Sequence, residues 1–388
     1  LQVRLALPGL TAYTTTGYYD QPYYTDRPEA SVQRLTVEEL RQMLESDRGK
    51  SDSDLARRLQ EVSLTERLSS SMLAQWTAQL PGKKSREALT VLADLSAFLD
   101  PPRAEVIADP PPDRGTQQQM IARATDYLTH TVRRLPDFYA RRAAALYVNT
   151  PPRYEGSIQM SPAEPVHLIN HSNGTVLYRD GAEVVDAKRH TQSRESGSLS
   201  TYGTFGPVLT ALLDELAHPN LAWSRWESDS GGRRAVFRFT VPVSQSHYEI
   251  AACCLPDGDG ATMFARRVGY DGEVALDPET GAILRLRISA ELTGIVPLNR
   301  SEIVVSYGAV SIGDRTYICP VHSVSFMHSR NVDTWQLWDE GFRTWGPWMS
   351  MLNDFSFTGY HIFRAKVRML NGYTSVPGSS PAAQAAPQ

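Results

Sequence analysis

The sequence predicts an α+β protein: an N-terminal helical bundle followed by a curved antiparallel β half-barrel with one plug helix. Up to about residue 135, apolar residues recur at the spacing of amphipathic helices. Past Pro136 the apolar period changes to two, which is typical of strands with one apolar face. Gly, Pro, Asn and Asp separate these strands, so neighbours in sequence are expected to pair as an antiparallel meander.

Length and charge narrow the class of protein. The 388 residues suffice for two domains. The net charge is −4 and acidic and basic residues are mixed throughout, so the sequence does not indicate a nucleic-acid-binding surface. No apolar run approaches the ~20 residues that would predict a transmembrane segment. The chain begins at Leu1 with no charged-then-apolar leader. This indicates an exported protein, periplasmic or at the cell surface, whose signal has been removed, although a trimmed chain would look the same.

The N-terminal part divides into an arm and a helical domain. Residues 1–34 are rich in tyrosine and lack a helical period, so they are expected to form an extended arm, either loosely ordered or packed on its own domain or a neighbour. In the helical domain, residues 35–136, Thr36 and Glu39 form a capping box. Apolar spacing predicts further helices over residues 55–62, 64–76, 88–99 and 117–135, packed as a small bundle.

The half-barrel domain is expected over residues 137–370, with a disordered tail over residues 371–388. One helix at residues 205–216, with Pro207 in its first turn, is the expected plug. The predicted strands cover residues 138–148, 156–160, 175–179, 221–227, 235–241, 247–254, 266–270, 272–276, 283–292, 300–307, 316–319, 323–328 and 355–369.

Alternation within the strands indicates which side chains are buried. Phe237 and Phe239 share one face of their strand, and Tyr248 and Ile250 share one face of theirs. One apolar and one polar face are expected for a curved sheet whose apolar face packs on a core and whose polar face meets solvent. A single short helix covers little apolar surface, so the sheet either curls on itself or leaves a cavity. These four residues are the candidate ligand-binding residues inside it.

Several segments resemble one group of bacterial folds. Residues 175–186 contain two strands joined by Asp-Gly, residues 274–286 contain the turn Asp-Pro-Glu-Thr-Gly, residues 307–320 form a further hairpin, and residues 205–216 match a plug helix. Residues 138–369 therefore resemble the open half-barrel of lipoprotein-carrier and periplasmic-sensor proteins (LolA/LolB-like and RseB-like). The helical front, with residues 204–207, 246–249 and 318–321, looks like a group of exported bacterial proteins without an assigned function. The resemblance implies a cell-envelope protein that holds a lipid or acyl chain.

Cys253, Cys254 and Cys319 allow two interpretations. Free cysteines are among the most buried residues, so all three fit a role as small core side chains. In an exported chain one disulfide is the alternative. Because adjacent strand residues point to opposite faces, strand parity favours Cys254 as the partner of Cys319.

A tryptophan-rich segment lies between His328 and Phe355. Gly and Pro within it indicate a loop, not a strand, that leaves the sheet as a flap over one end of the half-barrel. As function, the flap is a binding lip, because tryptophan is frequent in binding surfaces. The candidate ligand-binding residues here are Trp335, Trp338, Trp345 and Trp348.

No catalytic or cofactor motif stands out. The tetrapeptide Asp229-Ser230-Gly231-Gly232 is interpreted as a hairpin turn, because no partner residues for a serine nucleophile accompany it. Residues 257–260 lack the downstream Glu of an EF-hand, and Asn173-Gly174 is typical of a turn. No catalytic residue, metal or cofactor is predicted, and the chain is not expected to be an enzyme.

Two functions fit these features. The first is a non-enzymatic cell-envelope binding protein that holds a lipid or acyl chain in the half-barrel, with a lipid or lipoprotein as partner. The second is a structural or scaffolding protein whose barrel is filled by its own side chains. It assembles with itself or with another envelope protein through the N-terminal arm and the helical domain. The space inside the half-barrel discriminates between them.

Overall fold

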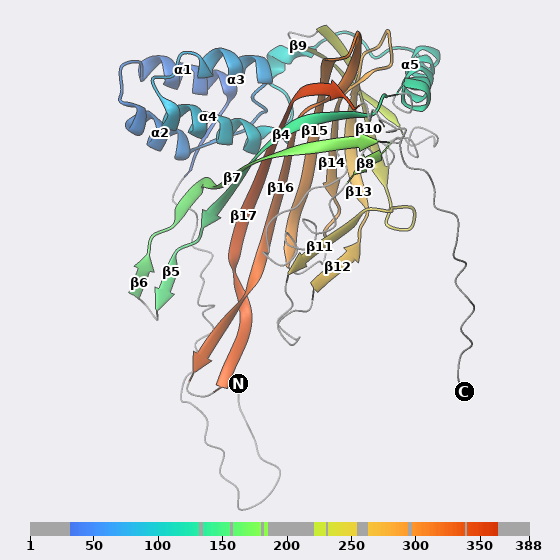
Figure 1. Ribbon diagram of the computed structural model, residues 1–388. Helices are drawn as coiled ribbons and strands as arrows, with labels where there is room; N and C mark the ends of the chain where they lie inside the picture. The colour runs from blue at the N-terminus through green and yellow to red at the C-terminus, as the bar shows by residue number, and fades with distance from the viewer. Residues whose placement is uncertain are drawn as a thin grey trace, which may run out of the picture.

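The computed structural model describes residues 32–131, 135–155, 158–179, 182–184, 221–229, 232–253, 263–293, 297–337 and 340–363. Most of the predicted arm, the predicted plug helix and the predicted tail lie outside these ranges. The described part contains five α-helices and an antiparallel sheet of eleven strands that does not close on itself, which confirms the α+β class (Figure 1). None of its helices is both long and apolar enough to cross a membrane.

The N-terminal helices follow capping signals in the sequence. Thr36 Oγ accepts a hydrogen bond from the Glu39 N–H at 3.2 Å, and the Thr36 N–H donates to Glu39 Oε2 at 2.7 Å, which confirms the predicted capping box. Leu40, Leu59 and Leu89 are fully buried in a core that the first four helices share. These helices are α1 (Val37–Ser46), α2 (Asp52–Gln60), α3 (Ser70–Thr77) and α4 (Lys83–Ser96).

A small parallel strand pair shortens two of the predicted helices. Strand β1 (Gln33–Leu35) pairs with β2 (Val62–Leu64), so the helix predicted up to residue 62 ends at Gln60 and the next begins only at Ser70. Val62 and Leu64 are both buried in this pair. Burial against a distant segment has outweighed the helical spacing of the local sequence.

Helix α4 is capped by another helix. Its N-cap residue, Gly82, makes no side-chain hydrogen bond, and Asp52 of α2 accepts hydrogen bonds from the Lys84 and Ser85 N–H groups at 3.1 and 2.9 Å. A Cβ on Gly82 would collide with the Asp52 carboxylate. Glycine at this position therefore lets one carboxylate fasten α2 to the start of α4.

The eleven-stranded sheet has the order β3-β9-β10-β13-β14-β15-β16-β17-β4-β7-β8. Two further hairpins, β5–β6 and β11–β12, stand apart from it. The strands are β3 (Val106–Ile107), β4 (Phe138–Thr150), β5 (Arg153–Glu155), β6 (Ile158–Ser161), β7 (Glu164–Arg179), β8 (Ala182–Val184), β9 (Ala222–Asp229), β10 (Gly232–Val241), β11 (Glu249–Cys253), β12 (Met263–Arg267), β13 (Tyr270–Leu276), β14 (Ile283–Ala290), β15 (Leu298–Ile312), β16 (Arg315–Leu337) and β17 (Glu340–Ile362).

The predicted Asp-Pro-Glu-Thr-Gly turn joins β13 to β14 and also positions helix α5 (Arg114–Asp126). Gly281 adopts a φ of +74°, and a Cβ there would collide with the α5 backbone at Arg123. Arg123 Nη1 donates to the Pro278 carbonyl at 2.9 Å. The helix predicted over residues 117–135 thus packs on the sheet and not on the other helices; it continues as a π-helical turn, Tyr127–Thr131.

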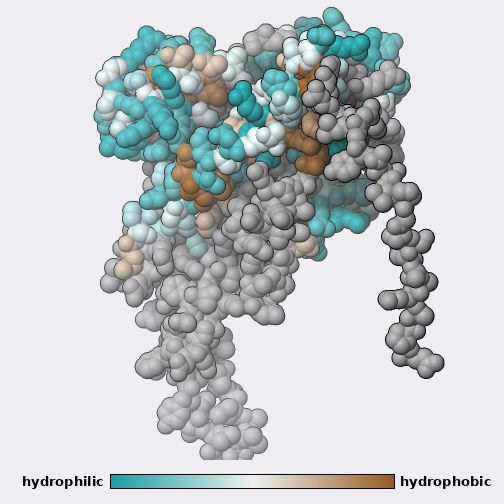
Figure 2. Space-filling model, viewed as in Figure 1, coloured by the Kyte–Doolittle hydropathy of each residue, from teal (hydrophilic) through white to brown (hydrophobic). Residues whose placement is uncertain are grey.

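The two faces of the sheet carry different helices. Val304 and Val305 are neighbours on β15 and point to opposite faces. Val304 shares a cluster with Val91 of α4, whereas Val305 shares one with Leu128 after α5. Figure 1 shows α1–α4 grouped on one side of the sheet and α5 on the other. In Figure 2 the α1–α4 region presents mostly hydrophilic side chains, with hydrophobic side chains confined to small patches.

The prediction of a loop between His328 and Phe355 is wrong. This segment belongs to β16 and β17, and only residues 338–339 between the two strands lie outside the described ranges. Gly346 and Pro347 lie at a register shift, between the pairs Val332↔Trp345 and Arg330↔Trp348, so they bend the strand without ending it. Asn173-Gly174, predicted as a turn, lies inside β7 for the same reason: pairing with β4 outweighs local turn preference.

Beyond this bend, β16 and β17 leave the sheet as a two-stranded ribbon, residues 332–337 and 340–345 (Figure 1). Pairing with β15 reaches only Ser329, and pairing with β4 reaches only Met351.

Candidate functional site

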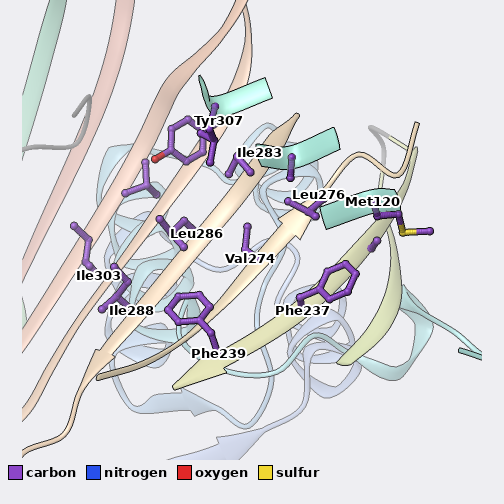
Figure 3. Packing of buried hydrophobic residues seen from close by; sticks show 14 of the residues in the cluster. Met120, Phe237, Phe239, Val274, Leu276, Ile283, Leu286, Ile288, Ile303 and Tyr307 are labelled. Atoms are coloured by element: carbon purple, nitrogen blue, oxygen red, sulfur yellow. The ribbon is translucent and has the colours of Figure 1, made fainter. Parts of the chain in front are cut away.

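The predicted apolar residues of β10 lie in a filled layer. Phe237 and Phe239 are 0% and 3% exposed and belong to a cluster with residues of β9, β13, β14, β15 and α5. Figure 3 shows Phe237, Phe239, Val274 and Leu286 pointing into this layer, with Met120 reaching it from α5. Val274 and Val305 also have no exposed surface. A side chain that lined a water-sized or larger cavity would keep accessible surface, so protein atoms fill the space around these residues.

Tyr248 and Ile250 lie at the edge of this layer. Ile250, on β11, is buried with residues of β4, β15, β16 and β17. The ring of Tyr248 meets that of Tyr270 edge-on at 5.8 Å, and Tyr270 meets Phe239 in the same way at 6.2 Å. Tyr270 therefore links Phe239 to Tyr248, whereas Ile250 belongs to a separate cluster.

The predicted tryptophans lie elsewhere. Trp335 and Trp345 are ribbon positions, opposite Phe342 and Val332, and Trp338 lies outside the described residues. Trp348, at the base of the ribbon, stacks on His328 at 5.0 Å, and the Arg330 guanidinium lies 4.4 Å from its ring centre. Trp348 is not among the described side chains that pack in the layer around Phe237 and Phe239.

Cys319 is a free thiol with no exposed surface, in a cluster formed by β4, β7, β15, β16 and β17. The predicted disulfide with Cys254, which lies outside the described residues, is not formed. Burial raises the pKa of the Cys319 thiol to about 12. This residue serves as a small core side chain, the alternative that the sequence had left open.

The opposite face of the sheet carries a polar site that the sequence did not predict. A cavity of about 80 Å³ separates α3 and α4 from the sheet, and its lining includes Asp94, Glu227, Arg285 and His322. Ligand sites for small molecules usually measure about 300–1,000 Å³. The cavity is thus of a size for an ion or a few water molecules.

Glu227 on β9 is the centre of the polar site. Its Oε2 accepts hydrogen bonds from Arg285 Nη1 at 2.9 Å and from Arg67 Nη2 at 3.1 Å. Its Oε1 accepts from Arg285 Nη2 at 3.0 Å and from Arg225 Nε at 2.9 Å. Because Arg67 precedes α3, this carboxylate fastens the helices to the sheet.

A second buried carboxylate continues the network. Glu273 on β13 accepts hydrogen bonds from both terminal nitrogens of Arg225 at 2.8 Å and from Arg238 Nε at 2.7 Å. Glu227 and Glu273 are 3% and 8% exposed. Such bidentate arginine–carboxylate pairs are strong and directional, so the polar face is locked in one arrangement.

The arginines hold both carboxylates in the charged form. Burial by itself raises the pKa of Glu227, but the charge and hydrogen bonds of Arg285, followed by the charges of Arg67 and Arg225, outweigh burial and hold the pKa well below its usual range. Burial likewise raises the pKa of Glu273, and hydrogen bonds from Arg225 and Arg238 outweigh it and lower the pKa to about 2.

Beside the same cavity, Asp94, His322 and Asp354 form a second polar group. His322 Nε2 lies 2.8 Å from Asp354 Oδ1 and 3.7 Å from Asp94 Oδ1. Burial, followed by the charge of Asp354, raises the pKa of Asp94. These side chains come from α4, β16 and β17 and include one imidazole and two carboxylates, which are metal-ligating groups.

Sequence reasoning missed this polar site for a physical reason. Strand alternation places Arg285 and Arg287 on one face of β14. It did not predict that helices cover that face, because the partner residues lie far away in the sequence. Glu227 is 58 positions from Arg285, and Arg67 is 160 positions from Glu227. The charge of Asp94 within the apolar stripe of α4 was the one local signal.

The fold and the site define an α+β protein in which buried ion pairs join the segment before α3 to an open antiparallel sheet. No protein-family model, curated protein or solved structure matches the chain. The resemblance to lipoprotein carriers and periplasmic sensors therefore stays a prediction.

Proposed function

We propose that this chain is a non-enzymatic scaffolding protein that assembles with a second copy of itself through the ribbon. Its location in the cell envelope is part of the proposal. So is the finer architecture, a helical bundle of α1–α4 that starts near residue 35 beside a plugged half-barrel that ends near residue 370 and includes β3 and α5. The filled apolar layer around Phe237 is the observation that supports a scaffold in preference to a lipid carrier, because a carrier needs space for an acyl chain.

The ribbon supports self-assembly. Within the described residues, its two strands pair only with each other, so each presents a free edge of backbone N–H and C=O groups. Strands of this length extend about 20 Å. An isolated two-stranded hairpin is marginally stable in water, and independent stability takes three or more strands with an apolar face. Two ribbons that join edge to edge about a two-fold axis form such a sheet and use the same surface on both copies.

Sedimentation velocity of the full chain tests this proposal. We expect a concentration-dependent monomer–dimer equilibrium below about 100 μM, and at least a ~10-fold higher dissociation constant in the double variant Trp335→Ser/Trp345→Ser, since aromatic residues contribute much of the energy of interfaces. Val184→Ser is the matched control, because Val184 is a 51% exposed apolar residue on the edge strand β8. A chain that stays monomeric, or a double variant that dimerises as the unchanged chain does, would contradict the proposal.

A further inference from the structure

Three side chains of metal-ligating type converge at the seam between α4 and the sheet. Asp94 comes from α4, His322 from β16 and Asp354 from β17, and their ligand atoms all lie within 4.8 Å of one another. His322 and Asp354 stand at neighbouring positions of adjacent strands, since His322 pairs with Ser356 and Val324 with Asp354. The cavity beside α3 and α4 is lined by both Asp94 and His322.

Asp94 carries an unsatisfied group. The residue is 2% exposed, and its Oδ2 atom is buried and accepts no hydrogen bond. Burying a carboxylate without a partner is costly, so such an atom needs a cation or a proton beside it. The charges that act on Asp94 are those of Asp354, which repels it, and of His322. One imidazole supplies at most one positive charge for two carboxylates, which leaves the group short of positive charge.

The spacing of the group fits a tetrahedral ion. Zinc binds imidazole nitrogen and carboxylate oxygen at about 2.0–2.2 Å, so two of its ligand atoms lie about 3.4 Å apart. The separations from His322 Nε2 are 2.8 Å to Asp354 and 3.7 Å to Asp94. These two values lie on either side of the zinc value, and the two carboxylates lie within 4.8 Å of each other, so shifts of up to about 1.4 Å would complete the shell. The adjoining cavity of about 80 Å³ has room for a water molecule as the fourth ligand.

We propose that Asp94, His322 and Asp354 bind one divalent transition-metal ion, with Zn²⁺ the best fit, and that the ion fastens α4 to β16 and β17. The imidazole excludes magnesium and calcium as preferred ions, because these take oxygen ligands. This site is independent of self-assembly through the ribbon, which lies beyond the sheet.

Isothermal titration of the metal-stripped full chain with ZnCl₂ tests the site. We expect one equivalent of Zn²⁺ per chain, and binding at least ~100-fold weaker in His322→Gln and in Asp354→Asn, because loss of an outer-shell partner alone costs 10–100-fold. His328→Gln is the matched control: His328 lies on the same strand and hydrogen-bonds Asn299, and its loss should leave affinity unchanged. Circular dichroism without metal checks that each variant is folded.

A second readout uses Co²⁺ in the unchanged chain. We expect visible absorption of four-coordinate Co²⁺ that Zn²⁺ displaces with the same stoichiometry, and this measurement stands even if a variant fails to fold. Absence of saturable Zn²⁺ binding, or equal binding in His322→Gln, Asp354→Asn and the control, would overturn the proposal. An octahedral Co²⁺ spectrum would overturn the four-coordinate site.

Discussion

Phe239→Ala is expected to lower the free energy of unfolding by about 3–5 kcal/mol, the range for truncating a phenylalanine in a filled core. Phe239 is 3% exposed and pairs across the sheet with Gly272, where the ring leaves no room for a Cβ. Its ring also meets Tyr270 edge-on at 6.2 Å. Truncation would leave a cavity in this layer. Urea denaturation followed by circular dichroism measures the loss.

Thr240→Ala is the control for this experiment. Thr240 is the next residue of β10 and is exposed, so its truncation should change stability by at most ~0.5 kcal/mol. A loss well below ~3 kcal/mol in Phe239→Ala, accompanied by release of a bound lipid, would mean that the layer is lined by ligand and not by protein.

Glu227→Gln is the second substitution with a large expected effect. It removes the charge that Arg285, Arg67 and Arg225 share, and leaves these arginines buried beside one another. Removing one partner of a buried ion pair costs about 3–5 kcal/mol. Glu38→Gln is the control, because Glu38 pairs with Arg41 on the exposed surface of α1, where an ion pair contributes little to stability.

The pH profile of stability distinguishes a lost charge from a packing defect. The folded-state pKa values of Glu227 and Glu273 are lowered, so their stabilisation is complete above the unfolded-state pKa of about 4.3 and is lost as the pH falls toward the folded-state pKa, about 2 for Glu273. Glu227→Gln should therefore lose less stability than the unchanged chain between about pH 5 and pH 2. Parallel profiles would contradict the role of this carboxylate.

Local rules predicted much of the fold. The capping box at Thr36, the Asp277–Gly281 turn and the apolar face with Phe237 and Phe239 each depend on residues a few positions apart, and each is confirmed. They also predicted the change from helix to strand near Pro136, since β4 begins at Phe138.

Long-range pairing accounts for what could not be predicted. Gly346 and Pro347 indicated a loop by local preference, but continuous pairing keeps them in β17. The polar site has the same origin: Asp94 and Asp354 are 260 positions apart in sequence and meet only because α4 packs on the sheet. Strand alternation predicts which face a residue takes, and it carries no information on which helix covers that face.

Organic extraction of the purified full chain, followed by mass spectrometry, tests most directly whether the protein is a scaffold with a filled half-barrel. Because side chains such as Phe237 and Val305 have no exposed surface, we expect no lipid in stoichiometric amount. One lipid or acyl chain per protein chain, retained through purification and lost in Phe239→Ala, would contradict the scaffold and establish a lipid carrier.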